Sequence, residues 1–444
     1  MPIGEGVSDA FDRAADTVYN QGGFNADDMN NDAARQLLTA TANTIKQGVD
    51  SHLPVDVPPT LRYALENNAF IFSGLKTFHA LREVGLSMVN DDGSIKSFDE
   101  FKADVKQINQ RYNENYLYAE YKHAVGTSQM AAKWVDIEAD GDRYDLQYRT
   151  AGDNKVRPDH AALNGITLPP SDPFWSKYYP PNGWGCRCTA VQVRVGKYQR
   201  SNPADAMQAG DTATEEAKQK MFRYNSGKTM QLFPPKHPYY KASPEAKAVT
   251  QQVAKIECAR SRYNDYLTDD NYNDVQFNES TGAIMATHVG HNVDNNKKTE
   301  LFGMSMAQLE RECQQCIFDM GHTAILRDES KHDPNGAKGD MLPALDLELD
   351  GIVMDIRSIT TNGYYGNALT AKNKQLGNVK RKTGESSDSV CLYFHDSTLF
   401  DEAKLLNDMQ WYKRRIVELG SKQRIKHVYV VVNGEQQLRV YDIE

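Results

Sequence analysis

Hydrophobic residues recur at helical spacing through most of the first 134 positions. The clearest helix follows a capping box formed by Ser97 and Glu100 and continues to about Trp134. Its hydrophobic face consists of Phe101, Val105, Ile108 and Tyr112. Earlier hydrophobic stripes at 38–49 and 61–85 predict two further helices. The front of the chain is therefore expected to be mainly α-helical.

A long stretch without helical periodicity follows, from Tyr144 to Thr189. Alternating polar and hydrophobic residues predict a short strand at 144–149, and prolines and glycines then predict a long loop. Cys186-Arg187-Cys188 restores an extended chain at the end of this loop. Because side chains alternate along a strand, both cysteines are expected on one face.

The pattern beyond residue 300 is that of an α+β module, whereas residues 199–300 are weakly patterned. Alternating hydrophobic residues flank Asp350-Gly351, which is the sequence of a two-residue hairpin loop. In that register Asp346 lies opposite Asp355, and Glu348, Asp355 and Arg357 share one face. A helix before this hairpin, a strand and a helix after it, and a closing hairpin complete the module.

Composition and charge narrow the class of protein. The 444 residues favour about three domains, and 40% hydrophobic with 25% charged residues is typical of a soluble globular chain. A net charge of -9 argues against a chain that coats nucleic acid, although a local basic site is compatible with it. The six cysteines are too sparse for a disulfide scaffold. Without a signal-peptide pattern or an apolar run of about 20 residues, we expect no contact with a membrane.

The long loop contains residues that could bind a metal. His160, Cys186 and Cys188 could supply three ligands of a structural zinc ion, with Asp153 or Asp159 as the fourth. The alternative is a metal-free loop in which Arg157 and two tryptophans hold two buried thiols in place.

The acidic hairpin around Asp350-Gly351 could be the centre of a metal-dependent nuclease. Asp350 and Asp355 could hold Mg²⁺, which activates water for attack on a phosphate. This arrangement resembles the PD-(D/E)xK nucleases, except that Arg357 stands where those enzymes have lysine. Because arginine stays protonated, it cannot act as a base.

A metal-free ribonuclease is the second interpretation of the hairpin. There the RNA 2′-hydroxyl attacks, His322 or His395 moves protons, and Arg357 or Lys374 stabilises the phosphorane charge. The third interpretation is a solvated strand face in a binding module without catalysis.

Two resemblances add a biological context. Asp153, Arg157, His160, Gly165 and the run Pro181-Asn182-Gly183-Trp184-Gly185-Cys186-Arg187-Cys188 follow a tyrosine-rich helix, and this order is similar to the phage Mu F-like minor head proteins over about 60–195. The resemblance implies a head-morphogenesis role beside portal and capsid proteins in the virion head.

The C-terminal module resembles the tRNA-nuclease toxin domains of contact-dependent inhibition proteins over about 300–444. Asp350-Gly351, Asp355-x-Arg357-Ser358 and the closing hairpin carry this similarity, with Asp-x-Arg in place of Glu-x-Lys. It implies host tRNA as substrate in the bacterial cytoplasm and an immunity protein as partner. A basic cluster expected in a loop would bind RNA phosphates, and it consists of Lys372, Lys374, Lys380, Arg381 and Lys382.

The expected fold is therefore multidomain, with a mainly α head domain carrying a long loop and small β element and an α+β nuclease-like C-terminal domain. The predicted regions are an adaptor (1–57), a head-morphogenesis domain (58–198), a linker with some helix (199–300) and a nuclease-like toxin domain (301–444). The predicted function is a minor head protein of a phage or prophage that carries a ribonuclease effector. The alternative is a purely structural head protein whose C-terminal domain binds scaffold or genome.

Overall fold

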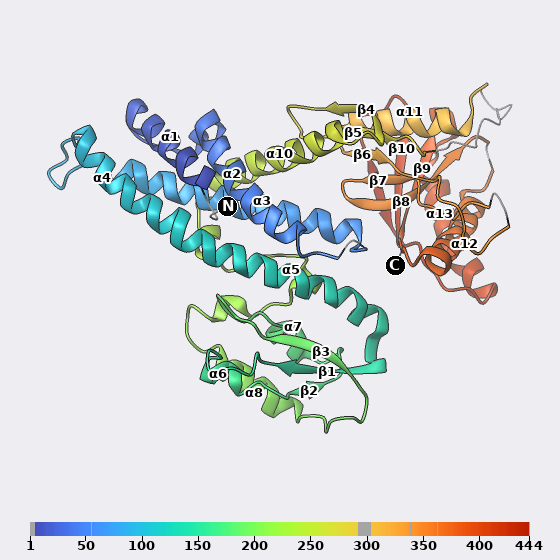
Figure 1. Cartoon of the computed structure of the whole chain (residues 1–444). Coiled ribbons are helices and arrows are strands. Elements are labelled where there is room, and N and C mark those ends of the chain that lie inside the picture. The colour runs from blue at the N-terminus through green and yellow to red at the C-terminus, as the bar shows by residue number, and fades with distance from the viewer. Residues whose placement is uncertain (1–4, 55, 292–302, 338–339, 362, 444) are drawn as a thin grey trace. The chain divides into compact units, whose positions relative to one another are not determined.

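The computed structural model of the protein describes residues 5–54, 56–291, 303–337, 340–361 and 363–443 (Figure 1). The chain forms two compact units, one of residues 1–57 and 61–258 and the other of residues 58–60 and 259–444. The boundary at 258/259 lies within a single helix, α10 (Pro244–Thr268). The domain boundary predicted after residue 300 lies outside the described residues.

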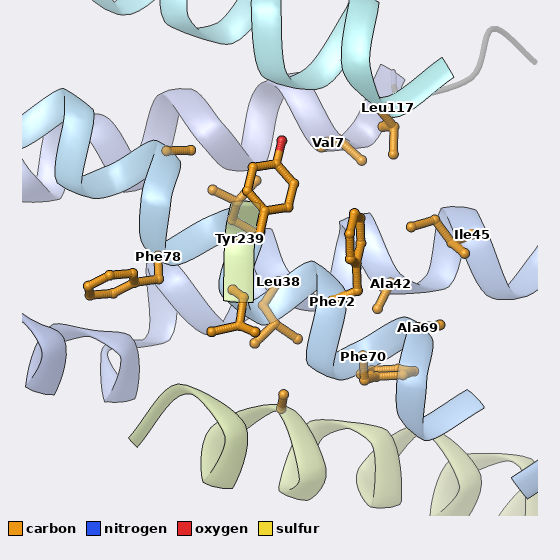
Figure 2. Packing of buried hydrophobic residues seen from close by; sticks show 14 of the residues in the cluster. Val7, Leu38, Ala42, Ile45, Ala69, Phe70, Phe72, Phe78, Leu117 and Tyr239 are labelled. Atoms are coloured by element: carbon orange, nitrogen blue, oxygen red, sulfur yellow. The ribbon is translucent and has the colours of Figure 1, made fainter. Parts of the chain in front are cut away.

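Helices around one hydrophobic core make up most of the first unit. They are α1 (Glu5–Gln21), α2 (Asp32–Asp50), α3 (Pro59–Leu86), α4 (Phe98–Asn109) and α5 (Leu117–Asp140), with a 3-10 turn at Ala26–Asn30 and a π-helical segment at Gln110–Tyr116. Figure 2 shows Leu38 of α2 and Phe72 of α3 among the packed side chains. The predicted capping box is confirmed, because the Glu100 N–H donates to Ser97 Oγ and the Ser97 N–H donates to the Glu100 carboxylate.

A small antiparallel sheet follows α5 in the first unit. A 3-10 turn at Gly141–Arg143 leads into the central strand, β1 (Tyr144–Arg149), which confirms the predicted strand. On its two sides β1 pairs with β2 (Thr167–Leu168) and β3 (Thr189–Arg194). The long connection from β1 to β3 contains two short helices, α6 (Pro158–Ala161) and α7 (Pro173–Tyr178). Trp175 and Tyr178 of α7 are fully buried, in a hydrophobic cluster that also includes Met130 and Trp134 of α5.

The chain then returns to the helical core through short elements. These are α8 (Pro203–Ala213), a 3-10 turn at Lys220–Phe222, α9 (Ser226–Thr229) and a 3-10 turn at Pro238–Tyr240. Phe233 stacks on Phe72 of α3 with ring centroids 3.6 Å apart, which anchors the returning segment. Among the described residues, every helix is too short or too polar to cross a membrane.

A mixed sheet of eight strands forms the centre of the second unit, in the order β11-β10-β9-β8-β7-β6-β5-β4 (Figure 1). The strands are β4 (Tyr272–Phe277), β5 (Ile284–His288), β6 (Ala324–Leu326), β7 (Leu347–Leu349), β8 (Ile352–Ile359), β9 (Ser389–Phe394), β10 (His427–Val432) and β11 (Arg439–Asp442). The pairs β5–β6, β8–β9 and β9–β10 are parallel, and the other pairs are antiparallel.

Helices cover both faces of this sheet. Hydrophobic side chains of α11 (Met306–Asp319) pack with one face, including Met354 and Ile356 of β8. On the other face α12 (Tyr365–Thr383) and α13 (Glu402–Glu418), which follows a 3-10 turn at Ser397–Leu399, pack with Val353 of β8 and with β9 and β10. The unit is therefore a three-layer arrangement of helix, sheet and helices.

The predicted hairpin at Asp350-Gly351 is confirmed. Leu349 pairs with Ile352, and both loop residues adopt positive φ, 47° for Asp350 and 84° for Gly351. Two positive φ values are the requirement of a type I′ turn, which explains the Asp-Gly sequence. Extended by one residue beyond the pair Leu347–Met354, the register places Asp346 opposite Asp355, as predicted.

Two stretches differ from their sequence interpretation. Part of the weakly patterned 199–300 region contributes β4 and β5 to the large sheet. The basic cluster predicted in a loop lies on a helix, α12. Its glycines hid the helix, since glycine disfavours helices, but here they allow close packing. A Cβ at Gly366 would lie 2.5 Å from Cε3 of Trp411, and one at Gly377 would lie 2.8 Å from Cζ of Arg424.

Candidate functional sites

The first candidate site is a cluster of one imidazole and two thiols in the long connection of the first unit. His160 lies on α6, where Pro158 occupies the first helical turn, and Cys186 and Cys188 lie just before β3. His160 Nδ1 is 3.5 Å from Cys186 Sγ and 3.7 Å from Cys188 Sγ. These distances show that the three predicted ligands come together. His160 and Cys188 are buried, and Cys186 is partly buried.

The two carboxylates considered as fourth ligand are engaged elsewhere. Asp153 accepts two hydrogen bonds from the Arg187 guanidinium, at 2.6 and 2.7 Å, and this interaction lowers the pKa of Asp153 to about 2. Asp159 accepts a hydrogen bond from Gln219 Nε2 at 3.4 Å. Neither carboxylate is therefore free to act as the fourth ligand in this structure.

The other residues of the head-protein motif shape the walls around this cluster. The Arg157 guanidinium donates to the carbonyl oxygen of Trp184 and passes directly over Gly183, where a side chain would collide with it. Gly165 has a φ of 87°, and its N–H donates to the carbonyl oxygen of Tyr148 at 2.8 Å. A cavity of about 90 Å³ adjoins the thiols and is lined by Lys155 and Arg157 among others.

Hydrogen bonding within the cluster sets the charge of the thiols. The hydrogen bond from Cys188 is the main cause that lowers the pKa of Cys186 to about 4, and His160 lowers it further. The pKa of Cys188 is raised, chiefly because it donates to that thiolate. The two thiols thus shift in opposite directions, and Cys186 is the one whose thiolate form is favoured.

The second candidate site is a pair of carboxylates on the β7–β8 hairpin. Asp355 of β8 is fully buried, and Asp346 directly before β7 is 8% exposed. Lys372 reaches the pair from α12, with Nζ 2.9 Å from Asp355 Oδ2. Asp346 Oδ2 accepts the backbone N–H of Ile356 at 2.9 Å. The hairpin register and the packing of α12 together bring two acids and one lysine into one buried place.

The pKa of Asp355 is shifted by its burial and by its charged neighbours. Burial raises the pKa of Asp355 well above its ordinary value, and the neighbouring Asp346 raises it further, while Lys372 opposes both effects. Within the described residues, neither oxygen of Asp355 has a partner in hydrogen-bond geometry, although Lys372 lies within ion-pair distance. A strongly perturbed buried acid beside specific charged partners is a common feature of functional sites.

A buried histidine and two glutamates adjoin this pair. His291 Nε2 lies 3.2 Å from Glu310 Oε2 of α11, and His291 Nδ1 lies 2.7 Å from Glu329 Oε1. Burial alone would lower the pKa of His291, but both glutamates together raise it to about 10. Asp346 contributes to a raised pKa of Glu310, which places the cluster within electrostatic range of the carboxylate pair. The two glutamates therefore favour the protonated form of His291.

The structure does not bring Asp350 to Asp355. Asp350 occupies the turn, where it accepts from the Thr323 N–H at 2.9 Å and lies 2.7 Å from His322 Nδ1. This contact raises the pKa of His322. Four residues of strand separate Asp350 from Asp346, which is about 13 Å. The carboxylate beside Asp355 is Asp346.

The remaining predicted catalytic residues lie apart from one another. Arg357 follows Asp355 on β8 but is exposed, whereas Ser358 points to the other side of the strand and is buried. His395 lies just after β9, with Nδ1 2.6 Å from Glu312 Oε2 of α11. His322 and His395 thus each pair with a carboxylate of their own.

The basic residues of α12 face two directions. Lys372 points inward to Asp355, and Lys382 pairs with Asp333 at 2.6 Å. Lys374 and Arg381 line a groove of about 900 Å³ between α12 and α13, and the exposed Lys380 lies one residue before Arg381. Other cations of this groove are Arg415 and Arg424.

Sequence reasoning missed the roles of Lys372, Glu310 and His291. A signal for Lys372 was present, because it lies at helical spacing between the buried Leu369 and Leu376 and so interrupts the hydrophobic stripe of α12. Glu310 similarly follows Leu309 on the buried side of α11. His291 follows β5 in a polar stretch with no such pattern.

Comparison with known proteins identifies a family for the part of the first unit that contains the thiol–imidazole cluster. Residues 94–191, which include α4, α5, β1, β2 and the thiol–imidazole cluster, match the family described as Phage Mu protein F like protein. This segment is therefore a phage Mu F-like domain.

Two individual relatives are similar over part of their length. The putative capsid assembly protein F of Escherichia phage Mu is 32% identical over 108 residues, which cover 22% of this chain and 25% of that protein. The Mu-like prophage FluMu F protein of Haemophilus influenzae is 34% identical over 71 residues, which cover 16% of this chain and 17% of that protein. The chain thus spans a quarter or less of these relatives. No solved structure gives a significant match.

Proposed function

We propose that this protein is a minor head protein of a phage or prophage and acts in capsid assembly. The observation that carries the proposal is the Mu F-like segment at 94–191, whose relative in phage Mu is named a putative capsid assembly protein. The expected partners are portal and capsid proteins, and the expected location is the virion head. We assign this role to residues 58–198, with 1–57 as an adaptor packed into the same core and 199–258 as the connection to the second unit.

A phage that encodes the chain provides the test. Mass spectrometry of purified heads is expected to detect the protein at low copy number, and deletion of 94–191 is expected to reduce the yield of DNA-filled heads. A phage with Asp355→Ala is the matched control and should assemble normal heads. Heads that lack the protein, or normal head yield after the deletion, would contradict the assembly role.

The second function we propose is a metal-dependent nuclease in residues 301–444. It is supported by the buried pair Asp346 and Asp355 with Lys372 at the same place. The residues fit a divalent cation, because Asp355 has two oxygens without a hydrogen-bond partner among the described residues and a carboxylate opposite it. Asp346 and Asp355 would hold the cation, since oxygen ligands suit Mg²⁺.

Mg²⁺ at this site would supply an activated water and neutralise charge on a phosphate. Lys372 takes the role that the sequence pattern assigned to Arg357. Its ammonium lies 2.9 Å from Asp355 in the resting protein, and unlike a guanidinium it can release a proton when its surroundings favour the neutral form. The metal-free alternative receives less support, because His322 and His395 are each paired with a separate carboxylate.

RNA is the substrate that we propose, with tRNA expected from the resemblance to toxin domains. Lys374, Lys380 and Arg381 on α12 offer a basic surface to its phosphates. An immunity protein would then be a further partner in the host cytoplasm. The alternative is that this unit binds scaffold or genome without catalysis, which the basic groove would also suit.

Expression of the full chain in a bacterium separates the two alternatives. The wild-type chain is expected to stop growth and degrade tRNA on a gel of total RNA, while Asp355→Ala and Lys372→Met are expected to be harmless. Lys331→Met, which removes an exposed lysine outside this basic surface, is the matched control and should retain toxicity. Intact RNA and normal growth with the wild-type chain would overturn the nuclease proposal.

An assay with the purified full chain addresses the metal. Cleavage of tRNA is expected to require added Mg²⁺ and to stop with EDTA. Cleavage that continues in EDTA would favour the metal-free mechanism with His322 or His395.

A further inference from the structure

The distances within the thiol–imidazole cluster match those of a metal site. In tetrahedral zinc sites the sulfur ligands lie about 2.3 Å and the nitrogen ligands about 2.0–2.1 Å from the ion, so a sulfur and a nitrogen ligand are about 3.6 Å apart. His160 Nδ1 lies 3.5 Å and 3.7 Å from the sulfurs of Cys186 and Cys188. The two sulfurs and the nitrogen lie within 4.8 Å of one another, as three corners of such a tetrahedron do.

We propose that His160, Cys186 and Cys188 bind a Zn²⁺ ion. Two thiolates and one imidazole are a ligand set typical of zinc, whereas Mg²⁺ and Ca²⁺ prefer oxygen. The nearby carboxylate of Asp153 does not compete, because Arg187 holds it on the exposed side of the chain with two hydrogen bonds. The pairing of Asp153 with Arg187 therefore leaves a site without oxygen ligands from these elements.

The fourth position faces the adjoining cavity of about 90 Å³. Its walls include Ala151, Val156 and Gly185, which offer no side-chain ligand, and the cations Lys155 and Arg157. The volume is large enough to hold a water molecule. A water molecule is therefore the fourth ligand in this proposal, and the nearby cations offset the negative charge of two thiolates.

The ion would connect two parts of the long connection. His160 belongs to the piece between β1 and β2, and the cysteines belong to the piece that leads into β3, so one ion closes the connection upon itself. Because metal binding to the folded state adds to its stability, the ion would stabilise the small sheet. The site is independent of the nuclease proposal.

Metal analysis of the full chain tests the site directly. Protein purified under reducing conditions with added ZnCl₂ and then freed of loose metal is expected to hold one zinc ion per chain. The double variant Cys186→Ser/Cys188→Ser is expected to hold none, and Cys316→Ser, which removes a half-buried thiol of the second unit, is expected to keep the ion. Wild-type protein without zinc, or zinc retained by the double variant, would overturn the proposal.

A second measurement does not depend on the folding of a variant. Alkylation of the wild-type chain is followed by mass spectrometry with and without a zinc chelator. Cys186 and Cys188 are expected to react several-fold faster after chelation, while the rate for Cys316 stays unchanged. Equal rates for the two thiols in both conditions would mean that they are only buried thiols, and would refute the site.

Discussion

Lys76 and Glu120 form an ion pair inside the helical core of the first unit. Lys76 Nζ is 2.5 Å from Glu120 Oε2, and both side chains are at most 3% exposed. Burial lowers the pKa of Lys76 and raises that of Glu120, and each group partly offsets the effect on the other. Removal of one partner leaves an uncompensated buried charge, whereas removal of both does not.

We therefore expect Lys76→Met to lower the free energy of unfolding of the first unit by about 3–5 kcal/mol. The double variant Lys76→Met/Glu120→Leu is expected to regain most of this loss. Urea denaturation followed by circular dichroism measures both. A single variant within about 1 kcal/mol of wild type would show that the pair is not energetically coupled.

Asp355 is expected to make the stability of the second unit depend on pH. Its pKa is raised in the folded state, so the folded protein holds a proton that the unfolded chain releases near pH 3.9. Stability attributable to this group is present below about pH 4 and is lost as the pH rises toward the folded pKa. Wild type should therefore lose stability relative to Asp355→Asn between about pH 4 and neutrality.

Denaturation curves at several pH values, recorded in EDTA, measure this difference. Asp319→Asn is a suitable control, because Asp319 is an exposed carboxylate of the same unit and its substitution should not reproduce the same pH dependence. Parallel profiles for wild type and Asp355→Asn would mean that Asp355 is not protonated in the folded protein.

At the scale of single residues, the sequence indicated some members of each candidate site and missed others. It located the opposition of Asp346 and Asp355, because strand register follows from alternation and from the Asp-Gly turn. It did not locate Lys372, since its position depends on how α12 packs on the sheet. The sequence also did not show that Asp153, which it predicted as a possible metal ligand, forms an ion pair with Arg187.

Among the helices, glycine positions distinguish close packing from open surface. Gly48 of α2 lies against the ring of Tyr121 in α5, and an added Cβ would overlap that ring. Gly126, within α5 itself, has open space around its Cα. The two positions form a matched pair in one unit, because both are helical and only one touches a neighbour.

We expect Gly48→Ala to destabilise the first unit by about 1–3 kcal/mol, since α2 and α5 would have to move apart. Gly126→Ala should stabilise it by about 0.5–1 kcal/mol, because alanine loses less backbone entropy in a helix. Chemical denaturation of the two variants measures the contrast. Stabilisation by both substitutions would show that Tyr121 moves aside without cost.

At the scale of helices and strands, the sequence predicted an element correctly where the residues that specify it are neighbours in the chain. The capping box at Ser97 and the hairpin at Asp350-Gly351 are both confirmed, because each depends on neighbouring residues alone. α12 was missed because its glycines fit against Trp411 and Arg424, which belong to a later part of the chain. Long-range packing of this kind leaves no local pattern.

At the scale of the whole molecule, the division into two units could not be derived from composition. The boundary lies within α10, where Cys258 belongs to the core of the first unit and Ala259 packs with β5 of the second. A continuous helix gives no proline, glycine or change of polarity to mark such a boundary. The sequence placed the transition in the polar stretch near 300, where local signals are stronger.

Separate cores predict separate unfolding of the two units. Calorimetry of the full chain is expected to show two transitions, because each unit has its own hydrophobic clusters and multidomain chains depart from two-state behaviour. Lys76→Met should lower the midpoint of one transition and leave the other unchanged. Asp355→Asn should change only the second, and this change should appear at neutral pH and vanish near pH 4. A single transition that both substitutions shift would mean that α10 couples the two units into one cooperative fold, because a shared helix can transmit unfolding only if neither core is stable without it.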